Sequence, residues 1–200
     1  AMALKRPKWK SGTVVVLEHV SRVLKGNALG DPHVRKLAAW LPPQYDEAAT
    51  HGRGRRFPVL VDMVGFTGSG LSHVAWKNFS ENVPERVARL IHERRMGPTI
   101  MVFPDCFTAL GGNQYLNSSA IGRYADYLTR EIVPFVDAEF RTLAAREHRA
   151  AGGGHADLTL RRGRRDGARA VRRQREGRGL RAARLGHDVA AGDGDREARA

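Results

Sequence analysis

The stretch FPVLVDMVGF, residues Phe57 to Phe66, decides the fold. It is an almost continuous apolar run, and a run of this length is typical of a strand that is buried on both faces. Strands of that kind form the middle of parallel sheets, where helices cover both sides. The glycine-rich sequence TGSG follows the run and predicts a flexible loop.

Upstream of this run, the sequence predicts two more strands. β-Branched residues predict the first strand over 12–24, and a turn cluster over 26–32 follows it. A second strand is predicted over 34–42, where two consecutive prolines stop it. The polar residues 44–56 then predict a loop.

Downstream of the run, helical and strand patterns alternate. A helix is predicted over 81–97, which has acidic residues early, basic residues late and a closing glycine. A short buried strand is predicted over 98–105, and a loop with a Gly-Gly turn follows it. Apolar residues at helical spacing predict a second helix over 120–140, which Pro134 is expected to kink or to divide.

This order of elements predicts an α/β fold with a mostly parallel sheet. The next element after Phe140 should then be a strand, and the linker RTLAAREH leads toward it. We predict that no strand arrives, because the composition changes at Ala150.

The last quarter of the chain has an unusual composition. Residues 151–200 contain 13 Arg, no Lys and no aromatic residue, and Ala, Gly and Arg supply 33 of these 50 positions. A segment with so few bulky apolar groups cannot bury enough surface to offset the entropy lost on folding. The sequence therefore predicts a partial α/β domain over 1–150 and a disordered, low-complexity basic tail over 151–200.

Charge and cysteine content narrow the class of protein. The formal net charge of +13 is typical of proteins whose partners are nucleic acid, anionic lipid or acidic substrates. Cys106 is the single cysteine, so no intrachain disulfide can form. No apolar run approaches the length of a membrane span, and no hydrophobic region follows the basic N-terminus. These features predict a soluble, cytoplasmic protein with no membrane partner, and they leave the oligomeric state open.

Three segments together resemble one esterase family of the α/β-hydrolase superfamily, which includes esterase D, feruloyl and enterochelin esterases, and related mycolyltransferases. The segments are WLPPQYDE with RFPVLVDMVGFTGSG, then IMVFPDCFTALGGNQYLNS, then YADYLTREIVPFVDAEFRTLAAREHRA, and they extend over about three quarters of the chain. The resemblance implies the N-terminal part of an α/β-hydrolase sheet with flanking helices. It also implies a serine esterase that acts on a small-molecule ester without cofactor or metal.

The sequence departs from this family at two points. Val64 stands where the family usually has a histidine before Gly65. The family's nucleophile motif, Gly-x-Ser-x-Gly on a tight turn between a strand and a helix, occurs nowhere in the 200 residues, and no serine follows Ser119. The resemblance implies that all three triad residues would lie after Ala150. No catalytic residue is therefore assigned, and we predict that the chain as written is inactive.

A change of reading frame near Ala150 explains the missing motif. GC-rich DNA read out of frame gives a tail rich in Ala, Gly and Arg. With suitable codons, a shift of one base turns residues 160–162 into Ser-Gly-Gly and residues 164–168 into Gly-Ala-Met-Ala, which resembles the nucleophile turn and the start of its helix. A naturally divergent tail and a genuine Arg-rich extension are the alternatives.

Four residues are candidates for a site. The resemblance implies that the backbone N–H of Phe66 helps to form the oxyanion hole, which stabilises the negative charge of a tetrahedral intermediate. Trp76, Asn113 and Tyr115 lie in loops expected at the carboxyl edge of the sheet, where the ligand sites of α/β proteins gather, so they are candidates for the substrate pocket. A plain strand-to-loop turn and simple loop packing are the alternative interpretations.

Other chemistry-bearing residues carry weaker signals. Asp105 and Cys106 end a strand, but no base is identified that would activate the thiol, so we predict a buried structural cysteine. Asp62 is unusual inside an apolar run and is expected to face a polar loop or a helix N-terminus. No metal-ligand spacing is present among the histidines, which we interpret as ordinary loop, strand or helix residues: His19, His33, His51, His73 and His92.

Two functions of different classes follow from these patterns. The first is a serine carboxylic-ester hydrolase that transfers an acyl group to water. The second is a non-catalytic α/β domain whose Arg-rich tail binds nucleic acid through its phosphates. Because the tail has neither aromatic residues nor regular Arg-Gly repeats, we expect it to bind nucleic acid only adventitiously.

Overall fold

The computed structural model describes residues 9–50, 54–113 and 115–152. The chain divides into two units, Ala1–Leu158 and Thr159–Ala200, and all the described residues belong to the first. Apart from its first two residues, the tail predicted over 151–200 lies outside the described residues.

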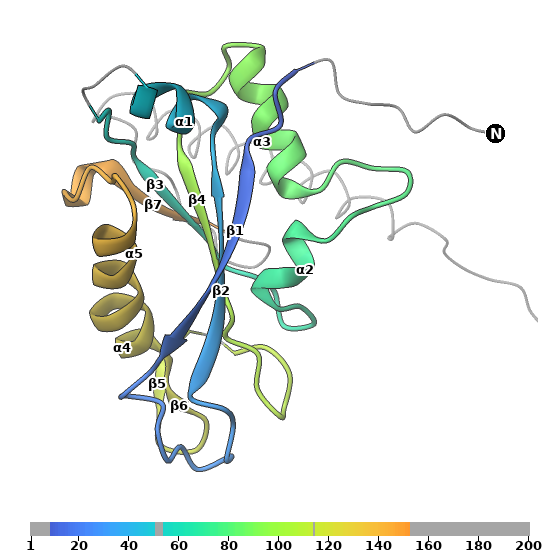
Figure 1. The fold of residues 1–200 in the computed structure, drawn as a ribbon. Coiled ribbons are helices and arrows are strands. Elements are labelled where there is room, and N and C mark those ends of the chain that lie inside the picture. The colour runs from blue at the N-terminus through green and yellow to red at the C-terminus, as the bar shows by residue number, and fades with distance from the viewer. Residues whose placement is uncertain (1–8, 51–53, 114, 153–200) are drawn as a thin grey trace, which may run out of the picture. The chain divides into compact units, whose positions relative to one another are not determined.

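A five-stranded sheet organises the first unit, with the strand order β1-β2-β4-β3-β7 (Figure 1). The strands are β1 (Thr13–Val20), β2 (Val34–Leu41), β3 (Val59–Asp62), β4 (Ile100–Pro104) and β7 (Arg149–Gly152). β2 pairs antiparallel with β1 and with β4, whereas β3 is parallel to β4 and to β7. The predicted α/β class is confirmed. The prediction of a mostly parallel sheet is confirmed for the direction of these strands, since β1, β4, β3 and β7 run the same way and β2 runs against them. β2 is reversed because no crossover helix connects β1 to it.

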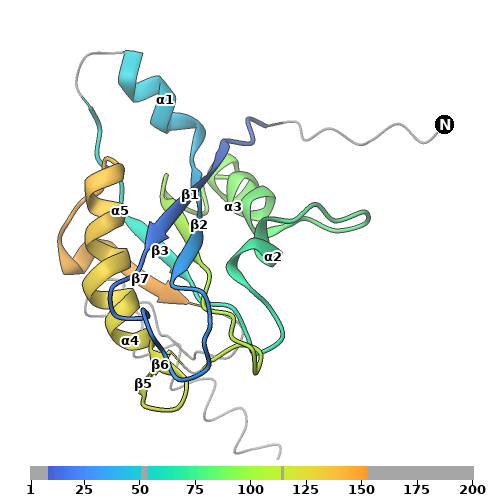
Figure 2. The same ribbon diagram turned by 60° about the horizontal axis from the view of Figure 1, so that its bottom comes forward.

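Helices lie on both sides of this sheet (Figures 1 and 2). One side carries α2 and α3, and the other carries α4, the π-helical turn η1 and α5. Two β-strands form a separate small hairpin, and a short 3-10 turn precedes β7. The bounds are α1 (Pro43–Thr50), α2 (Gly70–Val74), α3 (Val83–His92), β5 (Asn117–Ser118), β6 (Gly122–Arg123), α4 (Tyr124–Asp126), η1 (Tyr127–Ile132), α5 (Val133–Glu139) and η2 (Arg146–His148).

The core has two halves, one on each face of the sheet. Alternate residues of a strand point to opposite faces, so β4 and residues 37–41 of β2, which are all buried, supply both halves. On the α2 and α3 side, Trp40 and Phe103 pack with Val87 of α3. On the α4 and α5 side, Val102 packs with Tyr127.

One segment predicted as a loop is largely helical, and a short helix begins at the last residue of another. α1 occupies much of the predicted polar loop over 44–56, and α2 begins at the last glycine of TGSG. Pro43 begins α1, where its fixed φ suits the first helical turn, and Asp46 places a negative charge near the positive end of the helix dipole. The segment 44–56 is predicted as a loop because it is polar, and that prediction leaves out these local helix signals near its start.

The helix predicted over 120–140 is present but is not one regular α-helix. Within it, the backbone N–H of Val133 donates to the carbonyl of Leu128, five residues earlier. Pro134 has no N–H to donate to the carbonyl four residues before it, and its ring crowds that carbonyl. The predicted effect of Pro134 is confirmed: the helix widens into the π-turn η1 just before this proline.

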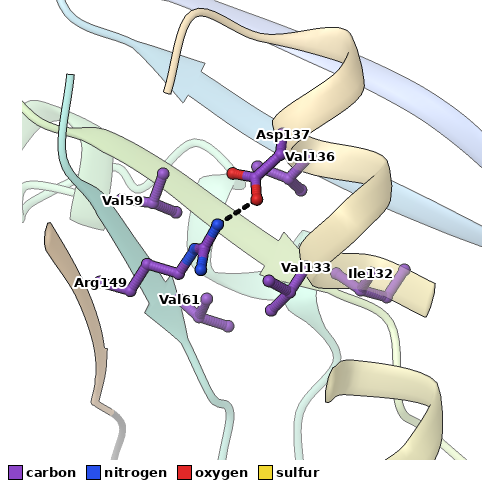
Figure 3. A pocket seen from close by; sticks show the side chains of 7 residues that line it. All are labelled: Val59, Val61, Ile132, Val133, Val136, Asp137 and Arg149. Atoms are coloured by element: carbon purple, nitrogen blue, oxygen red, sulfur yellow. Dashed lines mark hydrogen bonds and ion pairs between the residues drawn. The ribbon is translucent and has the colours of Figure 1, made fainter. Parts of the chain in front are cut away.

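Strand β7 corrects the prediction that no strand follows Phe140. Its residues Arg149–Gly152 pair in register with Val59–Asp62 of β3. Figure 3 shows Arg149 reaching over the groove beside β3 to form an ion pair with Asp137 of α5. The sequence concealed this strand because its four residues form no apolar run, and the pairing with β3 supplies backbone hydrogen bonds instead.

Glu131 of η1 ties the helical layer to the turn after β1. Its carboxylate accepts hydrogen bonds from the N–H groups of Arg22 (2.8 Å) and Val23 (3.0 Å) and from the hydroxyl of Ser21 (2.5 Å), and His19 Nε2 lies 3.5 Å away. Burial acts to raise the pKa of this carboxyl, but the hydrogen bonds outweigh it and hold the pKa below its ordinary value.

We predict that Glu131→Gln lowers the free energy of unfolding by about 1–3 kcal/mol near neutral pH, because hydrogen bonds to a charged acceptor are lost. The folded-state pKa is depressed, so the contribution is present above the ordinary carboxyl pKa and is lost as the pH falls through the lower folded value. Denaturant unfolding of both proteins at neutral and acidic pH should show the difference narrowing in acid. Glu139→Gln, at an exposed position of α5, is the control, and an equal loss there would contradict the prediction.

Candidate functional site

The carboxyl ends of β3, β4 and β7 meet at one edge of the sheet, because these three strands run parallel. β3 continues into residues 63–69, here named the β3 loop. β4 continues into residues 105–116, here named the β4 loop, of which 114 lies outside the described residues. The carbonyl of Gly152, at the end of β7, accepts a hydrogen bond from the Met63 N–H at 2.6 Å. Ligand sites of α/β sheets form at such edges, so this edge is the candidate site.

Three successive carbonyls of the β3 loop are engaged by the protein. The Val64 carbonyl accepts from the Tyr115 hydroxyl at 2.5 Å, and the Phe66 carbonyl accepts from the Gly112 N–H at 2.6 Å. The Gly65 carbonyl accepts from the Gly68 N–H at 3.1 Å, which closes a turn. Burial raises the pKa of the Tyr115 hydroxyl, so this group keeps its proton and donates at neutral pH.

The N–H of Phe66 belongs to the same peptide unit as the Gly65 carbonyl. The unit is trans, so the two groups point in opposite directions. Because the carbonyl faces Gly68, the N–H points away from the loop's own turn. Within the described residues no acceptor is found for this N–H, and the Phe66 side chain beside it is 56% exposed. An unengaged backbone donor held in a fixed direction is what an oxyanion hole requires.

The β4 loop approaches the β3 loop so closely that only glycine fits between them. A Cβ atom on Gly112 would lie 2.7 Å from the Cα of Phe66 and 2.8 Å from its carbonyl oxygen. A Cβ atom on Gly111, whose φ is +102°, would lie 3.2 Å from the Phe66 ring. The Gly-Gly turn seen in the sequence therefore fixes the position of Phe66.

Asn113 braces the β4 loop from within, and Tyr115 ties this loop to the β3 loop. Asn113 donates to the Cys106 carbonyl at 2.5 Å and accepts from the Tyr115 N–H at 2.6 Å. Trp76 is 65% exposed and belongs to the connection between α2 and α3. This connection lies apart from the β4 loop in both ribbon views (Figures 1 and 2). The structure thus brings Asn113 and Tyr115 to Phe66 but not Trp76, and a role of these residues in substrate binding stays a prediction.

Arg35 fixes the base of the β4 loop. This buried side chain of β2 donates to the carbonyl of Phe107 at 2.7 Å and to the hydroxyl of Tyr124 at 2.8 Å, and it lies 3.4 Å from the Asp105 carboxylate. Burial raises the pKa of Tyr124 to about 12, although the Arg35 charge acts in the opposite direction. Arg35 thereby connects the central sheet, the loop and α4.

Cys106 is buried, as the sequence predicted. Burial raises the pKa of its thiol well above the ordinary value, and the neighbouring Asp105 carboxylate raises it further. A nucleophilic cysteine needs the opposite shift, so this thiol is structural.

Asp62 and His73 form a pair that the sequence interpretation missed. Asp62, at the end of β3, is hydrogen-bonded through Oδ2 to Nδ1 of His73 in α2. The expectation that Asp62 faces a polar loop or a helix N-terminus is wrong, because it faces this histidine. An acidic residue inside an apolar run was the available signal, but nothing in the spacing identified its partner, eleven residues further on.

The described residues contain neither a cluster of metal-ligating side chains nor a helix that could span a membrane. No group of three or more histidine, cysteine or acidic side chains there is arranged to hold a metal ion. No helix in the same part of the chain is both long enough and apolar enough to cross a membrane.

Comparison with solved structures shows what the fold is similar to. A ferulic acid esterase aligns with a TM-score of 0.54 and 20% identity over 71% of this chain and 50% of its own. The CE1 ferulic acid esterase AmCE1/Fae1A from the anaerobic fungus Anaeromyces mucronatus aligns with a TM-score of 0.52 and 20% identity over 75% of this chain and 52% of its own. FphF, a fluorophosphonate-binding serine hydrolase from Staphylococcus aureus, aligns with a TM-score of 0.52 and 15% identity over 71% and 47%.

These likenesses show that the described residues have a fold similar to that of these esterases and of this serine hydrolase. The chain spans about half the length of the solved structures that it matches. No protein-family model matches the sequence, and no curated protein matches it either. The resemblance inferred from the three sequence segments is therefore confirmed at the level of the fold.

We predict that Gly112→Ala displaces the β3 loop and lowers the free energy of unfolding by about 1–3 kcal/mol, since backbone atoms of Phe66 must move to admit the methyl group. Denaturant unfolding measures the loss, and amide exchange at Phe66 reports the displacement. Gly97→Ala is the control, because a Cβ atom there has nothing within 4 Å. Equal stability of the two variants would show that the loops are not tightly packed.

Proposed function

We propose that this chain carries the N-terminal part of a serine carboxylic-ester hydrolase, which transfers the acyl group of a small-molecule ester to water. The proposal rests on the backbone of the β3 loop. This loop presents, at the carboxyl edge of the sheet, the Phe66 N–H, which has no acceptor among the residues that the structure describes. In the esterases that the sequence resembles, the strand after the 120–140 helix leads into the nucleophile turn.

The chemistry assigns one step to this loop. A serine, deprotonated by a histidine that an acid orients, attacks the ester carbonyl and forms a tetrahedral oxyanion. The Phe66 N–H donates to that oxygen, and one such donor contributes roughly 3–4 kcal/mol to stabilisation of the transition state. A substrate of modest size is supported by the structure of a ferulic acid esterase with a similar fold, AmCE1/Fae1A, in complex with ferulic acid.

We further propose that the chain as written does not complete this reaction, because Gly-x-Ser-x-Gly is absent from its 200 residues. A change of reading frame accounts for the absence. The in-register pairing of β7 with β3 through Gly152 supports a change at or shortly after that residue. The partial esterase domain then ends with β7, and binding of nucleic acid by the Arg-rich residues that follow is adventitious.

The 200-residue chain is expected to hydrolyse p-nitrophenyl acetate no faster than free imidazole at the concentration of its eight histidines. The reason is that the oxyanion donor alone supplies no nucleophile. Release of p-nitrophenolate measures the rate. Fast hydrolysis that a single substitution within residues 9–152 abolishes would overturn this expectation.

Sequencing the coding DNA around codon 150 tests the frame change, and a single-base correction is expected to restore Gly-x-Ser-x-Gly. In the restored protein, replacing the amide of Phe66 by an ester linkage deletes its N–H and leaves every side chain in place. This change should lower kcat by roughly 10²- to 10³-fold with little change in KM, because the donor acts on the transition state. The same replacement at Phe79, which is 96% exposed, is the matched control. An equal loss at both positions would contradict the assignment of Phe66.

A further inference from the structure

Asp62 and His73 flank the β3 loop in the sequence and are hydrogen-bonded to each other. Asp62 immediately precedes the loop, and His73 lies in the short helix α2 that follows it. The side chains are 13% and 28% exposed, so water competes only weakly for their hydrogen bond. None of the chemistry assigned above uses this pair.

We propose that Asp62 and His73 are a positioning pair, which holds α2 in place and through α2 sets the direction of the Phe66 N–H. The catalytic meaning of this inference rests on the proposed function, since the direction of that N–H matters for an oxyanion. The structural part of the inference stands on contacts alone.

The helix α2 depends on ties to the rest of the molecule. It has five residues, and its N-cap Ser69 makes no side-chain capping hydrogen bond. A helix of this length is not stable by itself. At its start, Gly70 packs on β4 so closely that a Cβ atom would lie 2.4 Å from the carbonyl oxygen of Phe103. Near its end, His73 ties it to β3 through Asp62.

The position of α2 determines the position of Gly68. A Cβ atom on Gly68 would lie 2.6 Å from Cγ1 of Val64 and 3.0 Å from Oγ of Ser72 in α2. Ser72 is itself fixed, since its N–H and its hydroxyl both donate to the Ser69 carbonyl, at 2.9 and 2.7 Å. Gly68 is thus wedged between α2 and the start of the loop, so a displacement of α2 moves Gly68.

Gly68 in turn determines the orientation of the peptide between Gly65 and Phe66. Its N–H holds the Gly65 carbonyl at 3.1 Å, and the Phe66 N–H points the opposite way. If this hydrogen bond is lost, the peptide is free to rotate and to present its carbonyl oxygen where the N–H had been. A carbonyl dipole in that direction repels an oxyanion instead of stabilising it. We therefore expect the Asp62–His73 pair to determine whether the loop presents the Phe66 N–H or the Gly65 carbonyl oxygen to the site.

The test follows the loop by NMR in the ¹⁵N-labelled 200-residue chain. His73→Ala and Asp62→Ala should shift the amide resonances of Phe66 and Gly68 and speed hydrogen exchange at Gly68 at least about tenfold. His73→Asn places an amide N–H near the position of Nδ1, so it should restore most of the wild-type spectrum. Asp62→Asn keeps the size of the side chain and supplies the measurement if an alanine variant does not fold.

A control variant and the exchange of core amides distinguish a positioning role of the pair from a general effect on stability. His19→Ala removes another partly buried histidine that lies beside a carboxylate, Glu131, and it should leave the β3 loop unchanged. A purely structural role of the pair would speed exchange of core amides, such as those of Leu37 and Val102, by the same factor as Gly68.

The proposal is overturned if Phe66 and Gly68 keep their wild-type resonances and exchange rates in the folded variants, or if the loop and the core change equally. Because the measurement uses no ester, its outcome is independent of whether the protein is an esterase. A positive NMR result together with an inactive frame-restored protein would reject the proposed function and leave the positioning role intact.

Discussion

Parallel pairing of β3 on both of its sides is the constraint on which the candidate site depends. β3 has only four residues, yet it contacts β4 along one side and β7 along the other in the same direction. Because parallel strands end at the same edge, the loops that follow β3 and β4 must meet beside the end of β7. An antiparallel arrangement of the same residues would place one of these loops at the opposite end of the sheet.

The meeting of these loops leaves little room for side chains. Gly68, Gly70 and Gly112 each lie where a Cβ atom would come within 2.8 Å of another atom. Backbone groups consequently pack against backbone groups, and their hydrogen bonds decide which way each peptide points. A site built in this manner presents main-chain donors in fixed directions, and it is held together by a few side chains, such as Arg35 of β2 and Tyr115 of the β4 loop.

The sequence predicted the buried strands well, because β3 and β4 form continuous apolar runs and β2 stops at proline. It also located α3, whose N-cap Asn82 and Glu85 form a capping box. It failed for β7, where pairing and not composition determines the structure, and for α1 and α2, whose polar or glycine-rich segments resemble loops. Phe66 could be identified from the order of the motifs as a candidate residue of the oxyanion hole. The Asp62–His73 pair could not be identified, since no local pattern reports a contact between the end of a strand and the following helix.

The two departures from the esterase pattern differ in their physical consequences. Val64 replaces a histidine that the family usually has, but the residue acts here through its carbonyl, which Tyr115 holds, and through a side chain that is 7% exposed. The neighbouring donor is the N–H of Phe66, which every residue except proline supplies, so the change at Val64 leaves it in place. A nucleophile is different, because its reactivity resides in one side chain at one position. The described edge can therefore retain the N–H proposed as an oxyanion donor, while the proposed reaction depends on a serine that these 200 residues do not place in a Gly-x-Ser-x-Gly turn.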